Sequence, residues 1–259
     1  MSLTSFLPHR AVLAVSGPDR IAFLQGLLTN DVSQAQPGQA VWAALLTPQG
    51  KVLHEVLILA DEQTLFLEVE ASRIDDLAAR LRKYKLRSKV EIAPRPNLRV
   101  AVTWGPDAAQ AGGWRDSRHA DAGYRQIVAE PNDWPTTPAL WAKHRRALGL
   151  AEGAEDTGIE ATFALELGLA DLAGVDFTKG CYVGQETTAR MKWRNLLRKR
   201  LVPVRVEGEA SPGAALTAAD GSEAGELRGH GDGLGLALLR LESLEKGPFQ
   251  AGAARVTML

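Results

Sequence analysis

Short apolar runs separated by turn residues fill the first hundred residues of the chain. Continuous or alternating apolar runs predict strands, whereas apolar residues three and four apart predict helices. The predicted strands are residues 11–15, 40–47, 51–60, 64–69 and 89–93, and the predicted helices begin after residue 19 and span about residues 74–84. Strands that pair locally around helices are typical of an antiparallel α+β unit and not of an alternating parallel sheet.

The pattern changes twice further along the chain. After a joint at Pro94-Arg95-Pro96, it predicts strands at residues 98–104 and 124–129 and helices at 137–148 and 160–167. From about residue 198 glycines separate the short strands 201–206, 214–217, 226–228, 235–239 and 254–258. Several short strands divided by glycines indicate a small β-barrel.

Charge and composition exclude several classes of protein. The 259 residues carry 30 basic and 31 acidic side chains, a net charge of −1, which argues against direct nucleic-acid binding because phosphate neutralisation requires a basic excess. The basic run at residues 80–89 is therefore interpreted as a solvated helix face, with a nucleic-acid or acidic-partner surface as the alternative. No stretch is apolar enough for a membrane span or signal peptide, so we expect a cytoplasmic protein without membrane association.

Metal binding by this chain alone is not expected. Cys181 is the single cysteine, so it can form neither an intramolecular disulfide nor a four-thiolate site. The five histidines are scattered without a ligand motif, and no metal site is predicted.

The most informative segment is Lys-Gly-Cys-Tyr-Val-Gly-Gln-Glu at residues 179–186, which we call the cysteine loop. Two glycines in five positions favour a tight loop over a regular element. Lys179 would stabilise the thiolate of Cys181 if the two side chains were close in space. The alternative is a glycine-rich turn around a buried structural cysteine.

The cysteine loop, together with Arg190, closely resembles the signature of the YgfZ family. These are folate-binding proteins related to the glycine-cleavage T protein, an aminomethyltransferase, and they have mitochondrial relatives that act in iron–sulfur cluster assembly. Weaker similarity is present at residues 16–32, 48–52 and 84–90. The resemblance implies an α+β, three-lobed aminomethyltransferase-like fold, in which two interleaved lobes and a C-terminal β-barrel surround a central channel. We expect residues 1–195 to form the folate-binding region, with an inner lobe at about 38–95, and residues 196–259 to form the barrel.

The same resemblance implies site residues. Glu166 is the candidate that holds the pterin of tetrahydrofolate, or of a one-carbon derivative, because one carboxylate accepts adjacent N–H donors; the alternative is a glutamate on a helix surface. Further candidates for folate binding are Tyr182, Gly184, Gln185 and Glu186, and Arg190, Lys192 and Arg194 for its carboxylate tail. A solvated charge run is the alternative for these three cations, and it is the preferred interpretation of Arg198-Lys199-Arg200.

Three residues are candidates for chemistry. Cys181 is a candidate nucleophile or cluster-contacting thiolate, and Lys179 is its candidate neighbour. Glu55, which follows His54, is either an acid–base group or half of a surface pair on an edge strand.

The function expected from these residues is that of a tetrahydrofolate-binding accessory factor. It would support assembly or repair of iron–sulfur proteins, including tRNA-modifying enzymes, with folate and iron–sulfur client or assembly proteins as partners. The alternative is an aminomethyltransferase or another folate-dependent one-carbon transferase. A scaffold that has lost folate is a third possibility, so whether the chain is an enzyme stays open.

Overall fold

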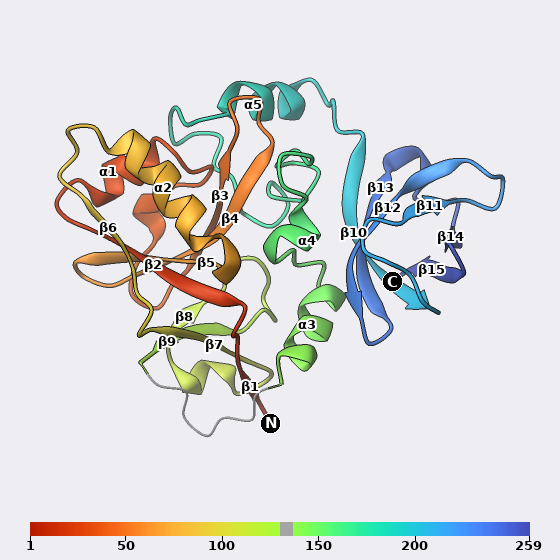
Figure 1. Cartoon of the computed structure of the whole chain (residues 1–259), viewed down its shortest axis with the longest axis horizontal. Coiled ribbons are helices and arrows are strands. Elements are labelled where there is room, and N and C mark those ends of the chain that lie inside the picture. Colours follow the sequence, from red (N-terminus) through yellow and green to blue (C-terminus); the bar gives the residue numbers. More distant parts are fainter. Residues whose placement is uncertain (130–136) are drawn as a thin grey trace.

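The computed structural model describes residues 1–129 and 137–259, which form two antiparallel sheets and a closed barrel (Figure 1). The larger sheet has the strand order β3-β4-β5-β2-β6. Its strands are β2 (Arg10–Ser16), β3 (Val41–Leu46), β4 (Val52–Ala60), β5 (Thr64–Glu70) and β6 (Glu91–Pro94). The helices α1 (Arg20–Gln25) and α2 (Ile74–Lys85) cover one face, where Leu24 and Leu77 pack on Leu13 and Val15.

The opposite face of this sheet is also covered. Along β3, Val41 and Ala43 point toward α1 and α2, while Trp42 and Ala44 belong to a cluster with residues 164–175 and with residues 201, 236 and 238 of the barrel. Every residue of β3 and β4 is therefore buried. A sheet covered on both faces needs continuous apolar strands, which explains why these two runs show little alternation.

The smaller sheet has the order β1-β7-β9-β8. Its strands are β1 (Leu3–Phe6), β7 (Arg99–Trp104), β8 (Trp114–Arg115) and β9 (Tyr124–Val128). The helix α3 (Pro138–Ala147) places Trp141 against Val102 and Trp104. Because β1 precedes the larger sheet and β7 follows it, the two α+β lobes are interleaved along the chain.

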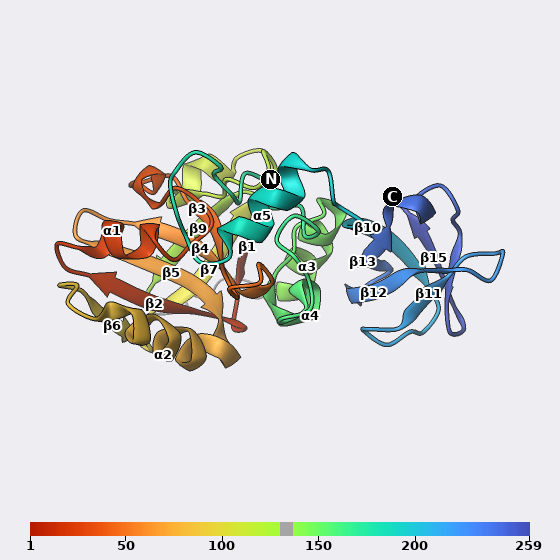
Figure 2. The same cartoon turned by 90° about the horizontal axis from the view of Figure 1, so that it is seen from above.

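The last part of the chain leads from the lobes into the barrel. It contains α4 (Gly153–Thr157), a series of turns, α5 (Gln185–Trp193) and six barrel strands in the order β10-β13-β12-β11-β14-β15. These strands are β10 (Lys199–Glu207), β11 (Ala215–Thr217), β12 (Glu223–Gly231), β13 (Leu234–Arg240), β14 (Phe249–Ala251) and β15 (Ala254–Met258). Short 3-10 turns are η1 (Val32–Gln34), η2 (Ala71–Arg73), η3 (Ala108–Ala111) and η4 (Leu241–Ser243). The barrel lies at one end of the molecule, beyond α3 and α4 (Figure 2).

The expected fold class, two interleaved α+β lobes with a C-terminal barrel, is confirmed. The helix expected at residues 160–167 is wrong, because this segment forms turns instead. Its backbone bonds to the start of β4: the Val52 N–H donates to the Thr162 carbonyl, and the Glu160 N–H donates to the Val52 carbonyl. Glu160 has a positive φ of 54°, which a regular helix does not permit.

The domain division at residues 195/196 stays a prediction. Among the helices of the described ranges, none is long and apolar enough to cross a membrane.

Candidate functional site

The cysteine loop is held in place by close backbone contact with the β3–β4 hairpin. Gly184 ends the loop with φ +82°, and a Cβ on it would lie 2.6 Å from the Thr47 carbonyl oxygen and 2.9 Å from the Leu46 Cβ. Gly50 in the hairpin turn is similarly restricted, since a Cβ there would lie 2.9 Å from the Thr187 Cβ. The hairpin and the cysteine loop are far apart in sequence but pack together closely. This packing requires glycine at both Gly50 and Gly184.

Cys181 is exposed on this loop. The Cys181 side chain is therefore not buried in an apolar core, which was the alternative suggested by the sequence. Gly180 precedes it with φ +101°, and an added Cβ there would meet open space. Its role is conformational, whereas Gly184 is needed for a close approach.

The Lys179 ammonium is hydrogen-bonded to the backbone of another segment. Its Nζ donates to the Leu28 carbonyl at 2.5 Å and to the Asn30 carbonyl at 2.7 Å, and lies 5.2 Å from the centre of the Tyr182 ring. Burial lowers the pKa of Lys179 to about 8. The lysine thus anchors the loop to the segment after α1.

Tyr182 is the buried residue of the loop. Its ring packs in the apolar cluster that contains Leu165 and Met191. Its hydroxyl is buried, with the Thr188 side chain as its polar neighbour. Burial raises the pKa of Tyr182 to about 12, so the group stays protonated and can donate.

The remaining candidates of this region lie on α5 or directly after it. Glu186, Arg190, Lys192 and Arg194 are exposed, and Gln185 is half-buried. None of the four charged side chains forms an ion pair within residues 1–129 and 137–259. Trp193 between them is 73% exposed and meets the ring of Phe177 edge-on, with centroids 6.0 Å apart.

Glu166 lies in the turns before α5 and is 8% exposed. Its Oε2 accepts the Phe163 N–H at 3.1 Å, and its carbonyl accepts the Leu201 N–H at 2.8 Å. Burial raises the pKa of Glu166, against the opposing effects of the Phe163 N–H and the Lys199 charge. It is therefore a buried carboxylate rather than a surface glutamate, and the charges of Lys199, Arg228 and Lys51 act on it.

Glu55 and His54 point to opposite faces of β4, as neighbouring strand residues must. His54 is buried and its Nε2 lies 2.8 Å from the Asp76 Oδ2 on α2. Burial lowers the pKa of His54 to about 4. Glu55 is also buried, and β4 is an inner strand, so the two residues form neither a joint acid–base site nor a surface pair on an edge strand.

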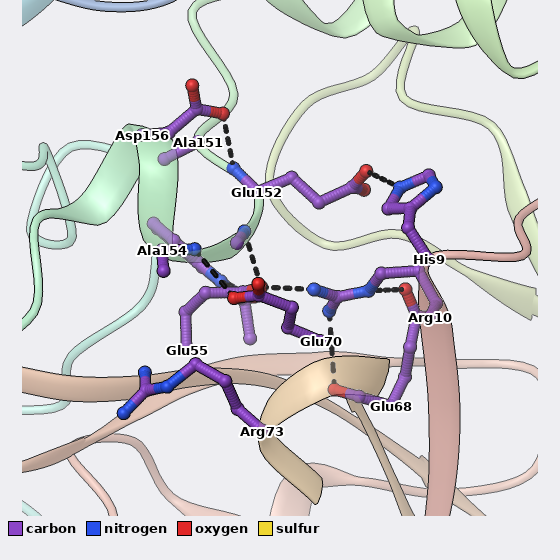
Figure 3. Close-up of polar contacts among 12 residues, drawn as sticks. His9, Arg10, Glu55, Glu68, Glu70, Arg73, Ala151, Glu152, Ala154 and Asp156 are labelled. Carbon is purple, nitrogen blue, oxygen red and sulfur yellow. Dashed lines mark hydrogen bonds and ion pairs between the residues drawn. The ribbon is translucent and has the colours of Figure 1, made fainter. Parts of the chain in front are cut away.

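Glu55 belongs to a buried ion-pair network between the two sheets and α4 (Figure 3). Its Oε1 accepts from the Arg10 guanidinium at 2.5 Å and from the Gly153 N–H at 3.1 Å, and its Oε2 accepts the Trp42 indole N–H at 3.4 Å. The Arg10 charge helps hold the pKa of Glu55 below its usual value despite burial. Both oxygens are occupied, so Glu55 is a fixed anion and not a free acid–base group.

The sequence analysis missed the rest of this network. Arg10 also donates from Nε to Glu68, while Glu152 accepts from His9, Arg125 and the Trp141 indole. Further buried members are Asp116, Arg118, Arg145 and Asp156. The available signal was a charged residue at an apolar strand position, such as Glu68 in Leu-Phe-Leu-Glu-Val.

Several pockets surround these groups. The largest described has a volume of about 630 Å³ and lies between η3 and α3, and one of about 470 Å³ lies between α3, α4 and the β12–β13 turn. Two of about 430 Å³ flank Phe177 and the start of β10, respectively. None of these four is lined by Glu166 or Cys181. No group of three or more metal-ligating side chains is present in the described ranges.

Comparison with known proteins shows which families this chain resembles. Residues 8–111 match the GCVT N-terminal domain family, and residues 198–259 match the CAF17 C-terminal beta-barrel domain. The mitochondrial iron–sulfur cluster assembly factor IBA57 of Homo sapiens is 33% identical over 96% of this chain and 80% of its own length. The chain belongs to the IBA57 family of iron–sulfur cluster assembly factors. The Mus musculus protein of the same name is 34% identical over 94% of the chain and 78% of its own length.

The fold of this IBA57-family chain is shared more widely. The structure of glycine cleavage system aminomethyltransferase T from Bartonella henselae superposes with a TM-score of 0.78, over 99% of this chain and 84% of that one. At 16% identity this likeness shows the fold alone.

One expectation is corrected by the relatives. The assembly factors from Homo sapiens, Mus musculus and Mycosarcoma maydis are all named as mitochondrial proteins. The expected cytoplasmic location is therefore wrong, and the relatives point to a mitochondrial one.

Proposed function

We propose that the chain supports assembly or repair of iron–sulfur proteins, tRNA-modifying enzymes among its clients, and that Cys181 supplies a thiolate to the cluster. Membership of the IBA57 family and the exposure of Cys181 on a fixed loop support this role. One thiolate cannot complete the coordination of a cluster, so a client, an assembly protein or a small thiol supplies the other ligands. The likeness of the cysteine loop to the YgfZ signature supports placing the chain near the YgfZ family.

The charge around Cys181 favours such a ligand. Residues 179–200 contain seven basic side chains and one acidic side chain, a local charge of +6 in a chain of net charge −1. A cluster with thiolate ligands is an anion, and a cationic surface attracts it toward the exposed sulfur.

A direct test is anaerobic mixing of the purified chain with a [2Fe–2S] cluster held by 2-mercaptoethanol. The wild-type chain is expected to change the visible circular dichroism of the cluster, because ligation by Cys181 places it in a chiral site. Cys181→Ser should abolish the change, while the neighbouring Gly180→Ala, the matched control, should keep it. Equal spectra for wild type and Cys181→Ser would remove the thiolate from the proposal.

We also propose that the chain binds tetrahydrofolate, or a one-carbon derivative of it, at Glu166. One feature of the residues present suits a pterin: Glu166 is a buried carboxylate with only Oε2 hydrogen-bonded among the described residues, and burial raises its pKa against the opposing effects of the Phe163 N–H and the Lys199 charge. The adjacent amino and ring N–H groups of a pterin would donate to this carboxylate. Tyr182, whose hydroxyl lies beside Thr188, belongs to the same apolar cluster as Leu165 and offers a further donor.

Bound tetrahydrofolate would supply a carrier for one-carbon units. The chain's own contribution is to orient the pterin through Glu166 and to exclude water with the surrounding apolar side chains. One-carbon transfer by this chain is the second candidate, but Glu55, the carboxylate expected to assist it, is committed to Arg10 and Gly153.

Calorimetric titration with tetrahydrofolate tests this site. Binding is expected for wild type, and Glu166→Gln should weaken it at least about tenfold because the charge-assisted hydrogen bonds are lost. Glu160→Gln, a change of the same kind at an exposed glutamate of the same segment, should have no effect. A wild-type chain that binds no tetrahydrofolate, or an unaffected Glu166→Gln variant, would refute the proposed site.

A further inference from the structure

An exposed apolar patch lies beside the cysteine loop. Trp193 at the end of α5 is 73% exposed, and its ring meets the half-buried Phe177 edge-on, with centroids 6.0 Å apart. Phe177 lies four residues before Cys181, and Leu196, just after α5, is 44% exposed. We call Phe177, Trp193 and Leu196 the aromatic patch. Single exposed apolar residues are common on surfaces, but a group of them, with its aromatic members in contact, indicates a surface that another molecule covers.

The aromatic patch is carried by a helix that is fixed to the fold. Thr188 and Met191 are the buried residues of α5, and the Thr188 hydroxyl donates to the Gly184 carbonyl at 3.1 Å. Met191 packs in the same apolar cluster as Tyr182. Figure 1 shows α5 over the end of the β3–β4 hairpin, which its Thr187 contacts. A surface that is ordered before binding loses little conformational entropy when a partner covers it.

Cations surround the aromatic patch. The Lys192 Nζ lies 5.6 Å from the centre of the Phe177 ring, while Arg190 is exposed on α5 and Arg194 directly after it. We call Arg190, Lys192 and Arg194 the α5 cations. None of them forms an ion pair with another residue in the described ranges. A partner with carboxylates around an apolar centre would therefore match this surface in charge as well as in hydrophobicity.

The positive charge is confined to this region of the chain. Residues 179–200 carry a charge of +6, so with a net charge of −1 the rest of the chain carries −7. A nucleic acid that extends beyond the region would meet this negative remainder, whereas an acidic patch on a protein would not. Tryptophan and arginine are also the residues that contribute most binding energy in protein–protein interfaces. The observations therefore favour an acidic protein over a nucleic acid.

We propose that the aromatic patch and the α5 cations dock an iron–sulfur protein that presents acidic residues around its cluster. This inference rests on the proposed role of Cys181, because docking here would bring the partner's cluster to the exposed sulfur. The apolar centre supplies most of the affinity, while the cations orient the partner and speed association. The α5 cations then serve a protein rather than the tail of folate: they are exposed and line none of the pockets described above, which suits a flat partner surface.

The test is site-specific photo-cross-linking in cells that express the full chain. A benzophenone amino acid replaces Glu186, which is exposed and lies on the same face of α5 as Arg190 and Trp193. The attached molecule and its cross-linked peptide are identified by mass spectrometry. We expect a protein that holds an iron–sulfur cluster, joined through a peptide with more acidic than basic residues. The same amino acid at the exposed Lys83 of α2 should not capture this protein.

Two variants test the two parts of the surface separately. Trp193→Ala should lower the yield of the cross-link about tenfold, as the loss of an interface anchor would. The triple variant Arg190→Gln/Lys192→Gln/Arg194→Gln should also lower the yield about tenfold, because three partly exposed ion pairs are lost.

Two controls separate docking from other effects. Lys83→Gln/Arg87→Gln/Lys89→Gln removes the same charge from the basic run at residues 80–89 and should keep the yield within about twofold. Cys181→Ser should also keep the yield, because docking uses the patch and the cations, not the sulfur. A cross-link that persists while wild type and Cys181→Ser give the same cluster spectrum would leave the docking surface standing and refute the cluster ligand.

Other results would overturn the docking surface. At position 186 these are attachment of RNA or of a second copy of the chain, a captured peptide without an excess of acidic residues, and no captured protein at all. Equal capture at position 83, or an unchanged yield in Trp193→Ala or in the triple variant of the α5 cations, would overturn it as well. Loss of the cross-link in Cys181→Ser would assign the binding to the sulfur instead of the patch, with the same consequence.

Discussion

Replacement of Gly184 by alanine should separate the hairpin from the cysteine loop. The added Cβ would lie 2.6 Å from the Thr47 carbonyl oxygen, so backbone must move, and overpacking of this kind costs about 1–3 kcal/mol. The positive φ of 82° adds about 1–2 kcal/mol for a residue with a Cβ. We expect the free energy of unfolding to fall by about 3 kcal/mol in total.

Gly180→Ala is the control, because Gly180 also has a positive φ but an added Cβ would meet nothing within 4 Å. It should lose only about 1–2 kcal/mol. The assay is urea unfolding followed by tryptophan fluorescence, with the rate at which native Cys181 reacts with a thiol reagent as a second readout. Gly184→Ala should change that rate as the loop shifts. Equal losses of stability in the two variants would refute the close-contact argument.

Three other changes test the buried charges. Glu55→Gln should lower the free energy of unfolding by about 3 kcal/mol, because the charge of Arg10 is left partly uncompensated. The control is Glu62→Gln at an exposed position, which should change the free energy of unfolding by less than about 0.5 kcal/mol in the same urea assay. His54 has a pKa of about 4 in the folded chain and 6.5 in the unfolded chain, so the free energy of unfolding should fall by about 3 kcal/mol in all as the pH drops from 6.5 toward 4. His54→Asn should flatten this part of the plot of urea stability against pH. An unchanged slope would contradict the burial argument. Glu166 has a raised pKa, so its ionised form destabilises the fold at neutral pH; Glu166→Gln should raise the melting temperature there but not below pH 4.5, and a lower melting temperature at pH 7 would contradict this.

Much of the fold follows from local pattern. The apolar run at 51–60 is β4, which pairs with its sequence neighbours β3 and β5. The expected strand at residues 11–15 is β2; its apolar run identifies it although its partners β5 and β6 are distant in sequence. The strands β1 and β14 were missed, because each has only three or four residues. In addition, β1 pairs with the distant strand β7. Residues 160–167 show a helical period, but their hydrogen bonds to β4 are tertiary and left no mark on the sequence.

The candidate site, too, could be predicted from the sequence only in part. The glycines of the cysteine loop indicate a special backbone, and the structure supplies the reason at Gly184. The direction of the Lys179 side chain depends on two carbonyls about 150 residues earlier, which spacing along the chain cannot reveal. Likewise, spacing along the chain cannot reveal that the barrel register places Arg240 opposite Lys199.

The role of Cys181 in iron–sulfur assembly is tested most directly in cells that lack this chain. The measurement is the activity of a [4Fe–4S] enzyme, normalised to its protein level, after complementation with wild type, Cys181→Ser or Gly180→Ala. We expect wild type and Gly180→Ala to restore the activity and Cys181→Ser to leave it low. Full restoration by Cys181→Ser would contradict the proposal that this sulfur contacts the cluster.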